Sequence, residues 1–342
     1  MNETTQLTQQ SRHPMGSAEP LLSVRDLEVT FTRHGEAPFK AVDGVSFDVR
    51  PGQTVGLVGE SGCGKSVTSL AIMGLLPARG NRVSGSAVFD GEDLLALSPS
   101  AMRDRRGADI AMIFQDPLSS LNPVITIGRQ VTEVMERHQG LSRKEATPKA
   151  AELLDRVGIP DPKARLVNYP HQLSGGMRQR ALIAMALACN PRLLIADEPT
   201  TALDVTIQAQ ILALLKELVV DTGTALVMIT HDLGVVAGLC DEVNVLYGGK
   251  IVERGGRHGL FERPRHPYTV GLLNSIPRLD APRGEKLSPV PGSVADNLPW
   301  ASACAFAPRC ANVLDVCTRE MPEWEGDQVV GFRCFNPMGG TR

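Results

Sequence analysis

A glycine-rich loop near the N-terminus has the residue types that bind a phosphate chain. Its glycines let the backbone approach the phosphates, and the helix after it adds free N–H groups and a positive dipole end. Lys65 supplies a charge for the β- and γ-phosphates, and the Ser66 hydroxyl suits one position on Mg²⁺. The loop therefore predicts a nucleoside triphosphate site lined by Gly59, Glu60, Ser61, Gly62, Cys63, Gly64, Lys65 and Ser66.

A pair of acids forms the second candidate site. The apolar run Leu193–Ala196 continues directly into Asp197 and Glu198. Ligands bind at the carboxyl ends of strands in open α/β sheets, so these acids would face a ligand. We expect Asp197 to hold Mg²⁺ and Glu198 to orient or deprotonate the attacking water. Alone, the pair could merely end a strand before Pro199; the phosphate loop upstream favours the catalytic interpretation.

Strands and helices alternate around these residues, which indicates an α/β core with a mainly parallel sheet. A hairpin is expected over 243–253, turning at Gly248-Gly249. A mostly helical stretch, about 116–188, interrupts the alternation and predicts an inserted subdomain. The expected strands are 21–31, 42–49, 54–58, 193–196 and 225–230, and the expected helices are 65–76, 127–137, 149–157, 177–188 and 205–220.

Composition and charge limit the classes of protein to which the chain could belong. The 342 residues carry a net charge of −3, so no global basic field favours nucleic acid. No apolar run reaches the ~18 residues that span a bilayer, and the polar residues 1–20 predict a flexible leader rather than a secretory signal. Prolines become frequent after about residue 254, which predicts a boundary between an ATPase-type unit, 21–255, and a C-terminal region, 256–342.

A sequence before the acidic strand carries a family resemblance. Leu173–Arg180 reads Leu-Ser-Gly-Gly-Met-Arg-Gln-Arg and resembles the signature of ATP-binding cassette (ABC) ATPases. The resemblance covers about residues 21–254. It implies a P-loop NTPase (RecA-like) core with an antiparallel β subdomain and an inserted α-helical subdomain. By position in the family pattern, Gln115 resembles the Q-loop glutamine, Asp204 the D-loop aspartate, His231 the switch histidine, and Phe31 (or Phe39) the aromatic that stacks on adenine.

The resemblance also implies a mechanism. Two cassettes pair head to tail, and each ATP lies between one chain's phosphate loop and the partner's signature, here Ser174, Gly175 and Gly176. A helix N-terminus at the signature suits anionic oxygen. Catalysis would use Glu198, His231 and Gln115, while Ser66, Gln115 and Asp197 would hold Mg²⁺.

Met177 narrows the resemblance, because the common signature has glutamine at that position. Together with Arg265–Thr269 (Arg-His-Pro-Tyr-Thr), it resembles the D-type cassette of oligopeptide, dipeptide and nickel importers. The implied partners are an F-type cassette, two transmembrane permeases and, indirectly, an extracytoplasmic solute-binding protein, with this chain on the cytoplasmic face of the membrane. A soluble ABC ATPase outside transport is the alternative, and a cassette that only binds ATP fits poorly with intact Lys65, Glu198 and His231.

The C-terminal region concentrates thiols at Cys304, Cys310, Cys317 and Cys334. Disulfides suit a cytosolic protein poorly, and a short proline-rich segment needs a staple to fold. Structural zinc commonly uses tighter cysteine pairs, whereas four dispersed thiolates can hold an iron–sulfur cluster. Peptide-importer cassettes resemble this pattern and carry a [4Fe–4S] cluster there. We therefore expect a [4Fe–4S] cluster, with zinc or metal-free thiols as alternatives.

Overall fold

The computed structural model describes residues 19–32, 35, 37–201, 203–276, 289–294, 296 and 303–339, so most of the expected leader lies outside the described residues. The strands are β1 (Leu22–Phe31), β2 (Phe39–Val49), β3 (Thr54–Val58), β4 (Asn81–Phe89), β5 (Glu92–Asp93), β6 (Ile110–Ile113), β7 (Leu193–Asp197), β8 (Ala225–Thr230), β9 (Glu242–Tyr247), β10 (Lys250–Gly256), β11 (Glu325–Gly326) and β12 (Gly331–Phe332). The α-helices are α1 (Lys65–Ile72), α2 (Pro99–Arg105), α3 (Pro117–Ser120), α4 (Ile127–Gln139), α5 (Arg143–Arg156), α6 (Pro162–Arg165), α7 (Gly175–Ala186), α8 (Val205–Thr222), α9 (Leu233–Leu239), α10 (Arg257–Glu262) and α11 (Pro267–Asn274).

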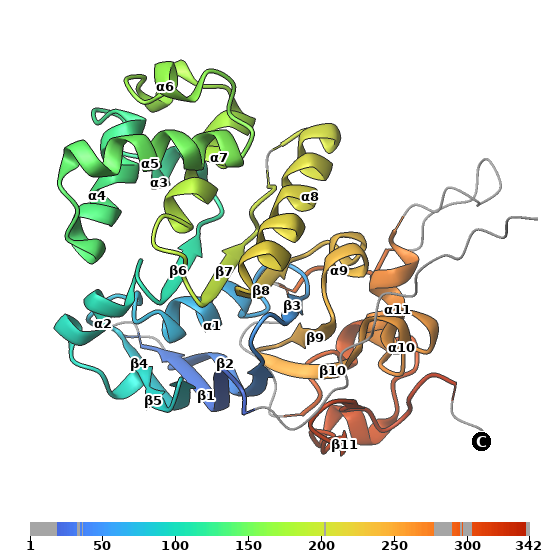
Figure 1. Ribbon diagram of the computed structural model, residues 1–342. Coiled ribbons are helices and arrows are strands. Elements are labelled where there is room, and N and C mark those ends of the chain that lie inside the picture. The colour runs from blue at the N-terminus through green and yellow to red at the C-terminus, as the bar shows by residue number, and fades with distance from the viewer. Residues whose placement is uncertain are drawn as a thin grey trace, which may run out of the picture.

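The main sheet forms the core of the molecule (Figure 1). Its order over the described residues is β11-β12-β10-β9-β3-β8-β7-β6, and β9, β3, β8, β7 and β6 run parallel. All residues of β3, β7 and β8 are buried, as expected of central parallel strands. The predicted hairpin is confirmed, because β9 and β10 pair antiparallel across Gly248 and Gly249. The order places the ends of β3, β8 and β7 side by side.

A second, antiparallel sheet has the order β2-β1-β4-β5. It lies below the main sheet in Figure 1, and α1 contacts both β1 and β2 of this sheet and β7 of the main one. Helix α1 is shorter than the expected 65–76. Gly74 takes a left-handed φ of 59°, and the Leu75 N–H bonds back to the Leu70 carbonyl at 2.8 Å, which closes the helix end.

Helices α3 to α7 form a separate group above the main sheet (Figure 1). Within it, α7 packs against α3, α4 and α5, and it also touches β6 and α8 of the core. Helix α5 begins with a capping box, in which Ser142 and Glu145 each bond the other's backbone N–H. The long helical stretch expected from the sequence therefore folds as a compact group that contacts the sheet through α7.

The C-terminal segment packs on the main sheet through strands and aromatic rings. β12 pairs antiparallel with β10, and β11 pairs with β12. Phe306 meets Tyr247 of β9 edge-on, with ring centroids 5.1 Å apart, and Tyr247 meets Tyr268 of α11 at 4.7 Å. These contacts join residues 306 and 268 directly to the strand that neighbours β3.

Candidate nucleotide site

The phosphate loop connects β3 to α1, as the sequence predicts. Gly64 has a φ of 98°, and a Cβ there would lie 2.5 Å from the Ala41 carbonyl oxygen, so no side chain fits at this position. The Lys65 Nζ donates to the carbonyl oxygens of Gly59, at 2.7 Å, and Glu60, at 3.0 Å. Burial lowers the pKa of Lys65, whose side chain folds back along the loop. Phosphate oxygens could replace both carbonyls as its acceptors.

The loop touches the end of β7 through one hydrogen bond. The Ser66 hydroxyl donates to Asp197 Oδ1 at 3.0 Å, and Asp197 is 5% exposed. Burial raises the pKa of Asp197, so a nearby cation would stabilise its charged form. A hydroxyl and a carboxylate oxygen this close together are suitable ligands for Mg²⁺.

Glu198 accepts hydrogen bonds from three side chains. Its donors are Gln115 Nε2 at 2.9 Å, Thr201 Oγ1 at 2.9 Å and His231 Nδ1 at 3.2 Å. The residue is 8% exposed, and its φ of 47° lies in the left-handed region, where non-glycine residues are strained. Such strain concentrates at functional sites. Residues expected to act together therefore meet at one carboxylate, and Thr201, which no sequence motif singled out, joins them.

The contact between His231 and Glu198 shifts the pKa of both groups. The hydrogen bond from His231 lowers the pKa of Glu198, so the carboxylate is charged at neutral pH. The same bond raises the pKa of His231 above its ordinary 6.5. This pair therefore favours the folded state most between about pH 4.5 and 6.5, the ordinary pKa values of the two groups. Its contribution declines as the pH rises through the elevated pKa of His231 and as the pH falls through the lowered pKa of Glu198. The effect is small, since the His231 side chain is 58% exposed.

We expect an NMR titration of the nucleotide-free chain to give His231 a pKa above 6.5. In Glu198→Gln, the value should fall, because the charged hydrogen-bond partner is lost. As a control, Glu217→Gln, which removes a carboxylate at an exposed position of α8, should leave the His231 titration unchanged. An identical His231 titration in wild type and Glu198→Gln would contradict the contact.

The start of the signature helix is accessible. Ser174 and Gly175 are exposed, and the Ser174 hydroxyl caps α7 by accepting from the Met177 N–H at 3.4 Å. A Cβ on Gly176 would lie 2.9 Å from Ile207, so α7 and α8 pack closely there. Asp204 caps α8, accepting from the Ile207 N–H at 3.0 Å. An exposed, capped helix start of this kind is free to receive a ligand held by another molecule.

The two aromatic candidates for adenine lie together at one end of the antiparallel sheet. Phe31 of β1 is directly opposite Phe39 of β2 in the register. Phe31 is half-buried and packs against the core. The register therefore places both residues at the same end of the sheet, and it does not favour either of them as the aromatic that would stack on adenine.

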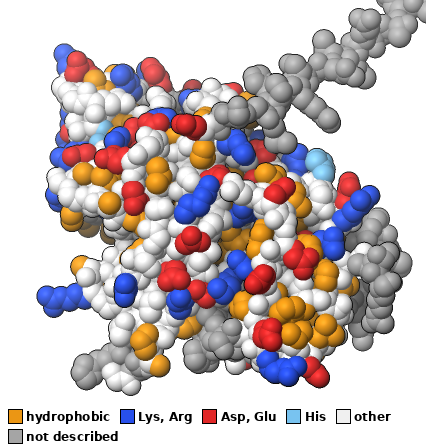
Figure 2. All heavy atoms as spheres, turned by 90° about the horizontal axis from the view of Figure 1, so that it is seen from below, with side chains coloured by type: hydrophobic (Ala, Val, Ile, Leu, Met, Phe, Trp, Pro, Cys, Tyr) orange, Lys and Arg blue, Asp and Glu red, His pale blue; other side chains and the backbone are white. Residues whose placement is uncertain are grey.

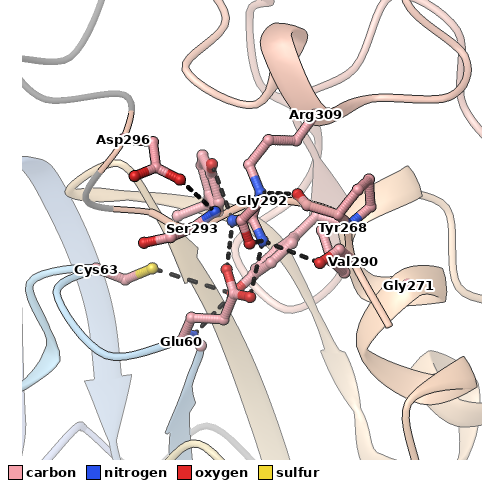
Figure 3. Close-up of polar contacts among 12 residues, drawn as sticks. Glu60, Cys63, Tyr268, Gly271, Val290, Gly292, Ser293, Asp296 and Arg309 are labelled. Atoms are coloured by element: carbon pink, nitrogen blue, oxygen red, sulfur yellow. Dashed lines mark hydrogen bonds and ion pairs between the residues drawn. The ribbon is translucent and has the colours of Figure 1, made fainter. Parts of the chain in front are cut away.

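Two residues at the phosphate loop were not found from the sequence. The Tyr268 hydroxyl accepts from the Glu60 N–H at 2.8 Å, and Arg309 Nη2 donates to Glu60 Oε1 at 2.9 Å (Figure 3). Tyr268 belongs to the His-Pro-Tyr motif, which was a signal without an assigned contact. Arg309 had no signal beyond its place next to Cys310. Both come from the C-terminal segment, more than two hundred residues further along the chain.

Backbone N–H groups point at the cysteine sulfurs. Asn312 donates to Cys310 Sγ at 3.3 Å, Leu314 to Cys317 Sγ at 3.4 Å and Asn336 to Cys334 Sγ at 3.4 Å, while Phe306 and Ala307 donate to Cys304. Burial raises the pKa of the Cys334 thiol to about 11. In the described part of the chain, no three side chains of His, Cys, Asp or Glu gather closely enough to hold a metal ion.

The charge distribution on the surface and the length of the helices determine which kinds of contact the chain can make with other molecules. Figure 2 shows positive and negative side chains mixed across the face seen from below, with small hydrophobic groups between them. Among the described residues, no helix has the length and apolar character needed to cross a membrane.

Comparison with known proteins agrees with this site. Residues 42–201 match the family model for "ABC transporter", and residues 252–317 match "Oligopeptide/dipeptide transporter, C-terminal region". Among the similar proteins is the dipeptide transport ATP-binding protein DppD of Bacillus subtilis (strain 168), 54% identical over 305 residues, or 89% of this chain and 90% of that protein. Another is the oligopeptide transport ATP-binding protein OppD of Escherichia coli (strain K12), 48% identical over 321 residues and 94% of each chain.

Solved structures agree on the fold. The ATP-binding cassette MJ0796, in a dimeric post-hydrolysis state bound to ADP and Pi, is 28% identical with a TM-score of 0.62, over 69% of this chain and 98% of that one. With relatives of this identity and coverage, the chain belongs to the ATP-hydrolysing subunits of ABC transporters, in the group with the oligopeptide/dipeptide C-terminal region.

Proposed function

We propose that this ATPase powers the import of dipeptides, oligopeptides or a related small solute through separate transmembrane permeases. The observation that carries the proposal is a match along almost the whole chain to peptide transport ATP-binding proteins, C-terminal region included. The chain would lie at the cytoplasmic face of a bacterial membrane, with solute choice made by an extracytoplasmic binding protein and the permeases.

The arrangement of the nucleotide site supports a composite mechanism. The phosphate loop, Asp197 and Glu198 lie on the core, whereas the Ser174 end of α7 is exposed in the helical subdomain. We infer that the signature of a second, F-type cassette completes this site and that Ser174, Gly175 and Gly176 complete the partner's site. ATP would favour the closed pair, Glu198 would act on the attacking water with His231 beside it, and hydrolysis would release the pair.

Gln115 supports coupling between the site and the helical subdomain. Its side chain donates to Glu198, and it lies two residues before Pro117, the first residue of α3 in that subdomain. With nucleotide bound, its side chain would help to hold Mg²⁺ and the γ-phosphate instead of Glu198. Since it lies at the junction, such a movement would shift the helices against the core.

A hollow between the core and the helical subdomain suits a permease helix. Its volume is about 560 Å³, and its lining is mostly apolar. Leu75 and Phe114 are exposed at its edge, with exposed fractions of 36% and 39%. The hollow is lined by Met73, Leu75, Met112, Phe114, Leu182 and Met185, among others. An amphipathic segment of a permease is the occupant this surface favours.

The test is uptake by the assembled transporter. The chain is co-expressed with the permeases, the binding protein and the second cassette of a peptide importer from the same genome, in cells that need an imported dipeptide for growth. Growth with this chain and its loss with Lys65→Ala would support the proposal. ATPase activity without association with the membrane subunits would instead indicate the alternative, a soluble ABC ATPase outside transport.

We also propose that Cys304, Cys310, Cys317 and Cys334 hold a [4Fe–4S] cluster as a structural staple. In the described part of the chain these thiols do not gather closely enough to hold a metal, so a cluster would have to draw them together. The proposal rests on the backbone N–H groups directed at all four sulfurs, because such hydrogen bonds stabilise thiolate ligands. The cluster would cross-link segments that carry little regular structure.

We expect anaerobically purified chain to be brown, with about four irons per chain, the stoichiometry of such a cluster. Cys334→Ser should lose colour and iron, because a thiolate ligand is removed, while Cys189→Ser, outside the group, should keep both. Colourless wild-type chain with stoichiometric zinc would favour the zinc alternative and overturn the cluster.

A further inference from the structure

We propose that Arg309 is a positioning residue for the phosphate loop, through which the cysteine-bearing segment sets the affinity for ATP. The inference rests on the proposed use of Gly59–Ser66 as the phosphate site. It adds a role for residues outside the ATPase core that the fold alone does not require.

Arg309 binds the loop through both ends of its guanidinium group. Nη1 and Nη2 contact the two carboxylate oxygens of Glu60, so the ion pair is bidentate (Figure 3). The Arg309 side chain is 4% exposed and that of Glu60 is 30% exposed. Bidentate arginine–carboxylate pairs are directional, and this one is shielded from water on the arginine side. The pair therefore fixes where Glu60 can lie.

The guanidinium is itself held in place. Its Nε donates to the Pro291 carbonyl at 2.7 Å, and Nη2 donates to the Gly292 carbonyl at 3.1 Å. Nη1 also reaches the Tyr247 hydroxyl at 3.3 Å. A group with this many partners does not follow the loop passively, because moving it would break several bonds at once.

A second contact reinforces the first. The Tyr268 hydroxyl accepts from the Glu60 N–H at 2.8 Å and lies 4.0 Å from Cys63 Sγ within the loop. Val294 lies where a Cβ on Gly62 would contact it, at 3.7 Å. The loop therefore has C-terminal residues against its outer side at several places, and Glu60 is held by both side chain and backbone.

Glu60 is coupled to the residue that meets the phosphates. The Lys65 Nζ donates to the Glu60 carbonyl oxygen at 3.0 Å in the nucleotide-free chain. A displaced Glu60 would carry this carbonyl and the neighbouring N–H groups with it. Because phosphate binding depends on several N–H groups aimed at one point, a small displacement weakens all of these bonds together.

The other end of the connection lies among the cysteines. Arg309 ends the 3₁₀ turn Ala307–Arg309, which has Cys304 before it and Cys310 directly after it. The Ala307 N–H bonds the Cys304 carbonyl at 3.0 Å, and the Cys310 N–H bonds the Ala307 carbonyl at 3.3 Å. Any ligand held by Cys304 and Cys310 would therefore fix the turn that presents Arg309.

The test compares Arg309→Ala and Arg309→Lys with Arg319→Ala, which removes an exposed arginine near Cys317. We expect the two Arg309 variants to raise the Kd for ATP of the purified full chain, and the KM of the assembled transporter, about tenfold. The kcat at saturating ATP should stay within about twofold, because the catalytic cluster is untouched. Arg319→Ala should match wild type.

A purely structural role would give a different pattern, with less active protein, a lower kcat and an unchanged KM. That pattern, or an unchanged KM, would overturn the proposal. Glu60→Gln keeps the loop backbone and removes the charge, so it guards against a variant that does not fold. It should raise KM similarly, and the double variant with Arg309→Lys should be no worse than either single one.

Two further variants distinguish the link to the cysteines from the proposed phosphate site itself. Cys310→Ser should raise the Kd for ATP as Arg309→Ala does, and an unchanged Kd would overturn the link to the cysteines. If Lys65→Ala binds ATP as well as wild type, the proposed phosphate site itself is wrong. If Lys65→Ala loses ATP while the Arg309 variants do not, only the present inference fails.

Discussion

Glu198→Gln should bind ATP like wild type and lose nearly all turnover, by about 10²- to 10⁴-fold in the assembled transporter. Glutamine keeps the shape of the side chain but cannot take a proton from water. It also replaces one carboxylate oxygen by a donor, although Gln115, Thr201 and His231 all present donors there. The measurements are phosphate release at saturating ATP and nucleotide affinity of the same sample.

Glu217→Gln is the matched control, since it makes the same chemical change at an exposed position of α8 and should leave turnover unchanged. Glutamine is preferable to alanine at 198, because it retains the size of the side chain at a residue with strained φ. Substantial turnover in Glu198→Gln would show that another group activates the water. Lost ATP binding would show instead that Glu198 supports the site's structure.

Lys65→Ala should lower ATP affinity by about 10- to 10²-fold, the range expected when charge-assisted hydrogen bonds are lost. In the nucleotide-free chain the ammonium group already lies within the loop, bonded to the carbonyls of Gly59 and Glu60. Its removal leaves these carbonyls without their donor and the phosphates without a charge. Binding of a fluorescent ATP analogue, with unlabelled ATP as competitor, measures the loss.

Lys144→Ala, at an exposed position of α5, is the control and should bind ATP normally. Lys65→Arg tests whether ATP binding needs only a positive charge at this position or also the shape of the lysine side chain. Arginine retains the charge, but its planar group does not match a slot in which lysine is 4% exposed. We expect it to bind ATP poorly too. Normal affinity in Lys65→Ala would mean that the loop is not the phosphate site.

The central strands could be predicted because burial on both faces leaves an unbroken apolar run, as in Leu193–Ala196. β4 escaped prediction, since it contains Gly85 and is only half-buried over most of its length. β12 escaped because two residues form no pattern. β4 and β12 thus depend on pairing with a neighbouring strand, whereas the strands that were predicted carry a pattern of their own.

The site residues likewise fall into those that the sequence could predict and those that it could not. Lys65 begins α1 after the loop that follows β3, and Asp197 and Glu198 lie at the end of β7. Because the carboxyl ends of parallel strands meet at one edge of a sheet, these residues could be expected together. Thr201 and Arg309 could not be expected, because their contacts depend on side-chain packing. Arg309 and Glu60 are separated by 249 residues, and nothing in the sequence of either segment indicates the other.

The pairing of β12 with β10 affects how the chain is made. While the chain emerges from the ribosome, the phosphate loop, the acids and His231 are all synthesised before Gly331 and Phe332. Until these two residues arrive, β10 is an edge strand with unsatisfied backbone groups, a known template for aggregation. A nascent or truncated chain ending near residue 256 would hold every catalytic group and still expose that edge. Premature termination should therefore yield an aggregation-prone product rather than a minimal ATPase.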